Sequence, residues 1–271
     1  MSQDRPLRCV VVTQNDPFFV LGFFHNFFAR YAKSRDWLDI RGLVIQQALG
    51  KKKMDQLVKQ MWDFFGPVDF VRMGLSYVMR TTAGRTLLAL GVNRPALTVE
   101  QATLAAGVPL RTDRNVNDPA FLEWLRREQI DVLVSVAASQ KFKPELLATP
   151  KWGCLNSHSG ALPRFRGMLP VFWTMQTGET HATVTIHKMN EELDDGEILL
   201  QGTVPICPGA SLAGLIRRTK ELSVELMLQA LRSIHDGSVR LLPNDRSKST
   251  YFSFPTQTDV AEFRRRGFRI L

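Results

Sequence analysis

Apolar positions in the first half of the chain fall into short runs that predict buried strands. Residues 7–13 form a run rich in β-branched side chains, which is typical of a strand buried on both faces. At two places a proline directly follows a capping residue, which is the order expected at a helix start. These are Asn15-Asp16-Pro17 and Asp118-Pro119. Strands that alternate with helices predict a parallel α/β sheet with right-handed crossovers. Further runs predict strands over 40–45, 108–111 and 131–136.

The segment 51–106 breaks this alternation, because its apolar residues recur at intervals of three and four. One apolar face with this spacing is typical of an amphipathic helix. A second helix is predicted over 70–80, and a third begins after Thr98, a candidate N-cap. We interpret the block as a helical insertion beside the sheet. The residues that form the first apolar face are Met54, Leu57, Val58, Met61, Phe64 and Phe65.

The second half returns to strands and helices, and it ends in a long amphipathic helix. Ser211 is the predicted cap of that helix, which we expect to run to about residue 235. Residues 1–206 are therefore expected to form the main domain, and 207–271 a C-terminal helix with a short extension. The other predicted elements are strands over 153–157, 182–189, 198–205 and 250–254, and a helix over 170–177.

Composition indicates an ordinary globular protein of 271 residues, with 44% hydrophobic and 23% charged residues. No apolar run approaches the roughly 18 residues that a membrane span needs, and the first residues do not have the pattern of a signal peptide. We therefore expect a soluble cytoplasmic protein. The three cysteines, Cys9, Cys154 and Cys207, are too widely separated for a disulfide framework or a zinc site, so no metal is expected.

The formal net charge of +9 is concentrated in two segments. A basic balance of this kind favours anionic partners, although charged runs are also common on solvated faces. Composition alone leaves both interpretations open. The basic residues are Lys51, Lys52, Lys53, Lys59, Arg72, Arg80, Arg85 and Arg94 in the insertion, and Arg264, Arg265, Arg266 and Arg269 near the C-terminus.

Three polar residues interrupt the apolar pattern where an α/β sheet binds its ligands. Asn156 and His158 lie two residues apart at the end of a predicted strand, so both side chains face the same space. The carboxyl ends of the strands are the usual ligand-binding edge of such a sheet. Asp194 lies in an acidic loop that follows another predicted strand, just before Gly196, which allows a sharp turn.

These side chains suit acyl transfer to an amine. Attack of an amine on a formyl carbon creates an oxyanion, and one donor fixed at that oxygen contributes roughly 3–4 kcal/mol. Asn156 and His158 can both donate hydrogen bonds. The amine must also lose a proton, for which His158 has a suitable pKa, and a neighbouring Asp194 carboxylate would orient the imidazole and favour its protonated form.

Two longer motifs resemble the folate-dependent formyltransferases, which include methionyl-tRNA, glycinamide ribonucleotide and sugar N-formyltransferases. Residues 155–167 (Leu-Asn-Ser-His-Ser-Gly-Ala-Leu-Pro-Arg-Phe-Arg-Gly) are similar to the first signature of the family, and residues 184–199 to the second. The resemblance covers about 105–235. It implies a Rossmann-like, mostly parallel sheet with helices on both faces, and a catalytic triad of Asn156, His158 and Asp194.

The resemblance also implies 10-formyltetrahydrofolate as the formyl donor. Its pterin is expected to lie against backbone groups at two segments, the end of one strand and the acidic loop. Arg164 and Arg166 are candidates for holding an anionic acceptor or the glutamate tail of the folate. The expected pterin-binding residues are Val136, Ala137, Ala138, Asn190, Glu192 and Leu193.

The acceptor is the less determined part of the prediction. The loop 13–16 lacks the glycine-rich phosphate loop of the glycinamide ribonucleotide enzymes, and Ser159 stands where many relatives have proline. Only about 35 residues follow the predicted long helix, fewer than the tRNA-binding barrel of methionyl-tRNA formyltransferases needs. We therefore expect a small anionic amine, such as a nucleotide-linked amino sugar, rather than nucleic acid.

Several alternatives remain open at this stage. The same triad could hydrolyse 10-formyltetrahydrofolate, the enzyme could resemble the tRNA-dependent branch, or the chain could be a binding protein of the same fold. Residues 51–80 are a candidate surface for an anionic membrane or a partner. The C-terminal extension is a candidate homodimer contact.

Overall fold

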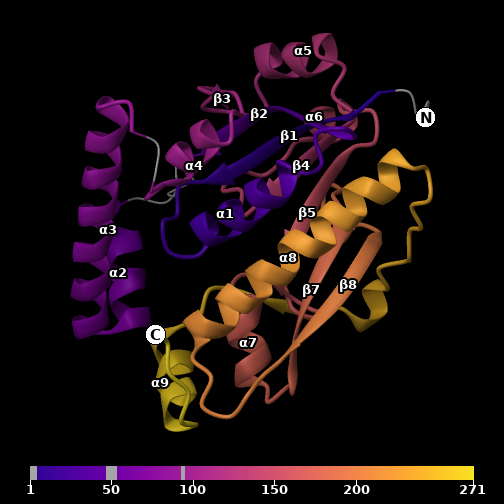
Figure 1. Cartoon of the computed structure of the whole chain (residues 1–271). Coiled ribbons are helices and arrows are strands. Elements are labelled where there is room, and N and C mark those ends of the chain that lie inside the picture. The colour runs from indigo at the N-terminus through magenta and orange to yellow at the C-terminus, as the bar shows by residue number, and fades with distance from the viewer. Residues whose placement is uncertain (1–4, 47–53, 93–94) are drawn as a thin grey trace.

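The computed structural model describes residues 5–46, 54–92 and 95–271, and Figure 1 shows a twisted sheet surrounded by helices. In the described residues the sheet has seven strands in the order β3-β2-β1-β4-β5-β7-β8. Neighbours from β3 to β5 are parallel, and β7 and β8 are antiparallel additions. The predicted mostly parallel sheet is thus confirmed. The strands are β1 (Leu7–Gln14), β2 (Leu38–Gln46), β3 (Leu110–Arg111), β4 (Val132–Val136), β5 (Cys154–His158), β7 (His181–Lys188) and β8 (Ile198–Pro205).

Helices cover both faces of this sheet, and β1 shows why. Cys9 and Val11 point into one hydrophobic cluster, and Val10 and Val12 into another on the opposite face, because successive side chains of a strand alternate. The first cluster is covered by α1 (Val20–Tyr31), α4 (Val99–Ala105) and α8 (Leu212–His235), and the second by α5 (Pro119–Arg127) and α6 (Pro144–Ala148).

The predicted caps explain where two of these helices begin. The Thr98 side chain accepts a hydrogen bond from the backbone N–H of Gln101, and Ser211 accepts one from Gly214. By contrast, α1 begins later than predicted, at Val20. The Asp16 carboxylate instead accepts hydrogen bonds from Phe18 N (2.7 Å) and Phe19 N (3.1 Å), which holds the chain in a turn before the helix.

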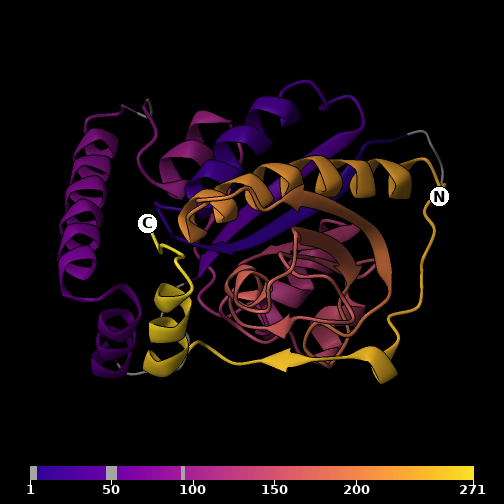
Figure 2. The same cartoon turned by 90° about the horizontal axis from the view of Figure 1, so that it is seen from below.

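Helices α2 (Met54–Phe65) and α3 (Pro67–Ala89) form a hairpin at one side of the sheet body (Figures 1 and 2). The predicted insertion begins at Lys51, Lys52 and Lys53, which lie outside the described residues. Its third predicted helix, α4, packs with α1 in the first cluster instead of joining the hairpin. The second helix runs well beyond the predicted 70–80.

The C-terminal segment returns across the molecule. It contains a 3-10 turn (Arg246–Lys248), β9 (Tyr251–Phe252) and α9 (Gln257–Arg265). Strand β9 pairs in parallel with β6 (Arg166–Gly167), just before α7 (Pro170–Gln176). A third hydrophobic cluster joins α2, α7, α8 and α9. Within the described ranges, no helix is both long enough and apolar enough to cross a membrane.

Candidate active site

Asn156 and His158 lie on β5, between parallel β4 and antiparallel β7. Register places Asn156 beside Ser135 on β4 and His187 on β7. Because they are two positions apart, both side chains lie on one side of the strand, and both approach the same atom, Oδ1 of Asp194. The distances are 3.5 Å from Asn156 Nδ2 and 3.5 Å from His158 Nδ1.

The hydrogen bonds of His158 assign its two ring nitrogens different roles. Nε2 lies 2.7 Å from the carbonyl oxygen of Phe165, which can only accept, so Nε2 carries the proton of the neutral imidazole. Nδ1 then keeps its lone pair and faces Asp194. Gly160 allows this close arrangement, because a Cβ there would lie 2.6 Å from His158 Nε2 and 2.8 Å from Phe165 O.

Asp194 reaches the strand end because the loop after β7 folds back tightly. A Cβ at Gly196 would lie 1.7 Å from Lys188 O, so only glycine fits there. Asp194 itself has a positive φ of 52°, a conformation that aspartate tolerates better than most residues. Its Oδ2 accepts a hydrogen bond from Gly167 N at 3.0 Å, while Asn244 Nδ2 donates to its backbone carbonyl at 3.2 Å.

His187 is the fourth polar group of the cluster. Its Nδ1 lies 3.0 Å from Lys188 O, so Nδ1 donates there and Nε2 accepts from Asn156 Nδ2 at 3.2 Å. Nε2 is also 3.6 Å from Asp194 Oδ1. The position of His187 in the predicted strand 182–189 indicates a residue that supports the site, not a catalytic group. The structure buries it on the same strand as Thr185.

Burial governs the electrostatics of the pair formed by His158 and Asp194, each 6% exposed. Desolvation lowers the pKa of His158 below its usual 6.5, although Asp194 and the Phe165 carbonyl oppose the shift. Asp194 favours the protonated form as predicted, but the desolvation of the ring outweighs this attraction. Burial alone would raise the pKa of Asp194, but the charge of His158 and hydrogen bonds lower it to about 2. At neutral pH the pair is thus neutral imidazole with carboxylate.

A third charge acts on the imidazole from α8. Lys220 is half-buried, and its ammonium group further lowers the pKa of His158. Burial also lowers the pKa of Lys220 itself, while the nearby Asp16 carboxylate raises it. Asp16 belongs to the loop after β1, so this pair lies at the carboxyl edge of the sheet. The charge spacing along the sequence does not reveal the pair, because 204 positions separate its members.

The residues expected to bind the pterin occupy two segments beside the cluster. Val136 ends β4, and Ala137 follows with a positive φ of 55°. Ala138 and Met189 pack against the same hydrophobic cluster, which brings the end of β4 and the loop after β7 to one side of the sheet. In that loop Asn190 Oδ1 accepts from Glu192 N at 3.0 Å, Glu192 is exposed, and Leu193 is 53% exposed.

Arg164 and Arg166 have different environments. Arg164 is half-exposed, forms an ion pair with Glu179 at 3.1 Å, and lines a hollow with Gln201 and Lys248. Arg166 is largely covered, and its guanidinium holds the loop through Leu193 O (2.9 Å from Nε) and Asp195 (3.2 Å). Arg164 is therefore the more available of the two for a ligand.

The C-terminal segment supplies contacts that are not evident from the sequence. Phe165 N donates to Thr250 Oγ1 at 2.9 Å, and Arg166 N donates to Thr250 O at 3.0 Å. The ring of Phe252 stacks on Phe165 at 5.7 Å and on Trp173 at 4.8 Å. The segment thus fixes the loop whose carbonyl holds His158. In the described part of the chain, no cluster of histidine, cysteine or acidic residues could hold a metal ion.

Comparison with protein families gives a match over much of the chain. The family described as formyl transferase matches residues 81–231. The methionyl-tRNA formyltransferase of Syntrophus aciditrophicus is 33% identical over 196 residues, 69% of this chain and 63% of that protein. The methionyl-tRNA formyltransferase of Moorella thermoacetica is 36% identical over 153 residues, 56% of this chain and 49% of that protein. The chain thus spans about half to three fifths of the length of these relatives.

Solved structures with the same fold extend the likeness to most of the chain. A sugar N-formyltransferase from a Shewanella species has a TM-score of 0.56 at 19% identity, covering 91% of this chain and 76% of that chain. Glycinamide ribonucleotide transformylase 1 from Symbiobacterium toebii has a TM-score of 0.57 at 16% identity, covering 89% of this chain and 96% of that chain. At these identities the likeness establishes the fold.

Proposed function

We propose that this chain, which belongs to the formyl transferase family, transfers a formyl group from 10-formyltetrahydrofolate to a primary amine. The observation that carries the proposal is the convergence of Asn156 and His158 on Asp194, each at 3.5 Å. The reduced folate, when bound, supplies the activated formyl group. The roles of the protein's own residues follow from their protonation and geometry.

His158 is the proposed general base. Its Nε2 proton is committed to Phe165 O, so Nδ1 is the atom that can accept a proton from the amine. The low pKa caused by burial keeps that atom unprotonated at neutral pH. Once Nδ1 is protonated, it faces the Asp194 carboxylate, which stabilises the imidazolium. Asp194 can do so because its own low pKa keeps it ionised.

Asn156 is the proposed donor to the formyl oxygen. One hydrogen of its Nδ2 is directed to His187 Nε2 at 3.2 Å, and the other makes only the long 3.5 Å contact with Asp194. The weaker contact is the one that a formyl oxygen can replace. His187 would then position the amide without touching the reacting atoms. A fixed donor of this type contributes roughly 3–4 kcal/mol when charge develops on the oxygen.

The residues beside the triad fit a flat donor. Ala137 and Ala138 have small side chains at the end of β4, and Leu193 presents an exposed apolar side chain in the loop after β7. The backbone groups of these segments are the hydrogen-bonding partners that we propose for the pterin. The side chains of Asn190 and Glu192 lie in the same loop.

For the acceptor we favour an anionic amine of low molecular weight, such as an amino sugar carried on a nucleotide diphosphate. Lys220, whose charge acts on His158, and the half-exposed Arg164 are the cations that we propose to hold its charge. A charged tRNA is the second candidate, favoured by the 33% identity to a methionyl-tRNA formyltransferase. The net charge of +9 suits either acceptor.

The function is tested by offering the purified chain 10-formyltetrahydrofolate with amino-sugar nucleotides, amino acids or charged tRNA. We expect one acceptor to gain the mass of one formyl group. Asp194→Asn, which preserves the left-handed backbone, and His158→Gln should each lower kcat/KM by about 10²- to 10⁴-fold. Near wild-type rates in either variant would refute the assigned roles, and tetrahydrofolate release without a formylated product would establish hydrolysis instead.

A further inference from the structure

Helix α3 presents an apolar stripe to solvent. Five of its aliphatic side chains, and that of Leu90 just beyond its end, are between 52% and 78% exposed. At about 100° per residue all six fall within an arc of roughly 120°; the first five lie within about 17 Å of helix, and the exposed Thr82 and Thr86 separate them from Leu90. An exposed apolar strip of this length marks an interaction surface. The residues of this outer stripe are Val68, Val71, Leu75, Val78, Met79 and Leu90.

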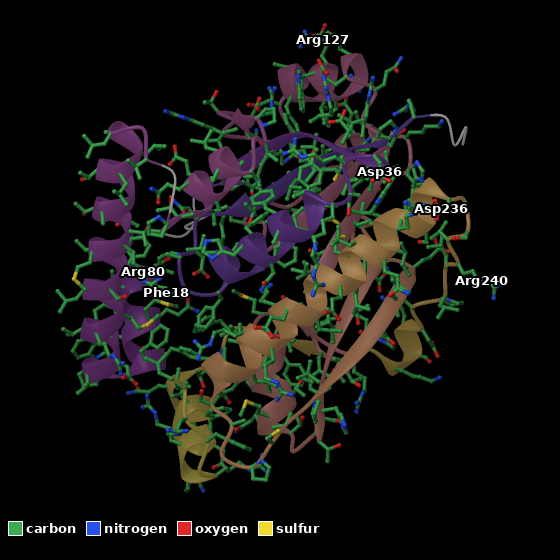
Figure 3. All side chains as sticks on the ribbon, in the orientation of Figure 1. Phe18, Asp36, Arg80, Arg127, Asp236 and Arg240 are labelled. Atoms are coloured by element: carbon green, nitrogen blue, oxygen red, sulfur yellow. The ribbon has the colours of Figure 1, made fainter. Side chains whose placement is uncertain are left out.

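The opposite face of α3 contacts the body at two points, which fix the rotation of the helix. The Tyr77 ring packs 6.4 Å from that of Phe18, in the turn after β1. Phe18 lies between the hairpin and the sheet body in Figure 3. Gly84 is buried so closely against Thr98 that a Cβ would lie 2.8 Å from its methyl carbon. Since the inner face is anchored at two points, the outer stripe on the other side of the helix is turned away from the body. Figures 1 and 2 show α3 along one side of that body.

The charges beside the outer stripe are almost all positive. Arg72 lies along one edge and Arg85 along the other, and Arg80 lies further around the same helix; all three are exposed. Asp69 is the one acidic residue of α3. An aliphatic strip bordered by guanidinium groups is complementary to a surface that is apolar below and anionic above.

We propose that α3 is an interfacial helix that binds the surface of an anionic lipid bilayer through its outer stripe. The helix lies in the plane of the membrane. Its valine, leucine and methionine side chains enter the boundary between headgroups and acyl chains, and Arg72 and Arg85 remain at the level of the lipid phosphates. This surface is separate from the candidate active site, so the proposal does not rest on the proposed reaction.

Two other occupants fit the same surface less well. Stripe-to-stripe contact with a second copy would bring the arginines of two chains together, each with a net charge of +9, and like charges oppose such contact. A nucleic acid would pair with the arginines but would leave the aliphatic side chains exposed to water. An anionic lipid surface satisfies both features of the helix.

The proposal is tested by sedimentation of the full chain with vesicles of phosphatidylcholine alone or with 30% phosphatidylglycerol. We expect binding to the anionic vesicles, at least tenfold weaker binding to phosphatidylcholine, and weakening by salt. Equal binding to both vesicle types, or no binding to either, would overturn the proposal.

Variants then separate the stripe from general surface hydrophobicity. The triple variant Val68→Gln, Leu75→Gln, Met79→Gln should lower the affinity for anionic vesicles at least tenfold. Leu242→Gln, at a leucine of similar exposure (58% against 60% for Leu75), should bind like wild type. Circular dichroism checks that each variant is folded. Unchanged binding by a folded triple variant would refute the proposal.

Lipid-free sedimentation equilibrium addresses the alternative of a second copy. We expect the same mass for wild type and for the triple variant over the concentration range. A concentration-dependent dimer that the triple variant abolishes would show that the outer stripe is an interface between chains, and would overturn the lipid assignment.

Discussion

The proposed catalysis depends on the protonation of one imidazole. The buried His158 faces a carboxylate that raises its pKa, whereas the charges of His187 and Lys220 lower it. Desolvation exceeds the attraction of Asp194, because burial withdraws water from the charged form of the ring. The result is a base that is unprotonated at neutral pH and is still poised to form an ion pair when it takes a proton.

The first prediction concerns the pH dependence of formyl transfer. Because protonated His158 cannot act as base, kcat/KM should fall as the pH drops through a midpoint below 6.5. Lys220→Met removes a positive charge that disfavours the imidazolium. The pKa of His158 should therefore rise, and the acid limb of the pH–rate profile should move to higher pH.

Arg217→Met is the matched control, since Arg217 is an exposed cation on the same helix. Its acid limb should coincide with that of wild type. A profile for Lys220→Met that also coincides with wild type would show that the Lys220 charge does not act on the catalytic base.

At the scale of elements, the short pair of β6 and β9 fixes the loop that ends at Phe165. Phe165 has a positive φ of 59°, a conformation that costs roughly 1–3 kcal/mol for residues other than glycine and persists only when the surroundings hold it. Thr250 and Phe252 provide that support through a hydrogen bond and a stacked ring. The Phe165 carbonyl can then hold His158 in place.

The second prediction tests this support. Thr250→Ala removes the acceptor for Phe165 N, so the free energy of unfolding should fall by about 1 kcal/mol. Because the loop also positions His158, kcat should fall roughly tenfold or more. Thermal unfolding and initial rates measure the two effects.

Thr256→Ala provides a control of similar stability cost. Thr256 caps α9 in a reciprocal capping box with Asp259, and loss of such a cap costs about 1 kcal/mol. Its kcat should remain at the wild-type value. If both threonine variants lost activity equally, the rate effect would come from general destabilisation and not from the loop.

At the scale of the whole molecule, the third hydrophobic cluster joins the hairpin to the sheet body. Phe64 of α2 is 5% exposed and packs against Phe172 of α7 at 6.0 Å and Phe254 at 5.4 Å. Arg264 of α9 donates to Phe65 O at 2.7 Å. Helix α2 and the C-terminal segment, which are far apart in the sequence, therefore stabilise one another.

The third prediction follows from this packing. Phe64→Ala should lower the free energy of unfolding by about 3–5 kcal/mol, since it leaves a cavity in the cluster. Trp62→Ala on the same helix should cost less than half as much, because Trp62 is 46% exposed. Urea unfolding of both variants measures the difference. A similar cost for the two would mean that the cluster contributes little to stability.

Much of the fold could be predicted from periodicity. The apolar pattern identified β1, β2, β4, β5, β7 and β8 within a few residues. In a strand, buried side chains are consecutive or alternate, and in a helix they recur at intervals of three and four residues. The two-residue strands β3 and β9 fall within the predicted strands 108–111 and 250–254. The short strand β6 and the helices α6 and α9 were not predicted, because their residues show no clear alternation or helical spacing.

The sequence by itself determined the strand that carries Asn156 and His158, the resemblance that connects them with Asp194, and the family. Only the tertiary structure decided what surrounds them. His187 and Lys220 approach the cluster from β7 and α8, and Thr250 from the C-terminal segment. Each is distant along the chain, so only packing brings it near. The depressed pKa of His158 has the same origin, because it depends on burial that no local pattern records.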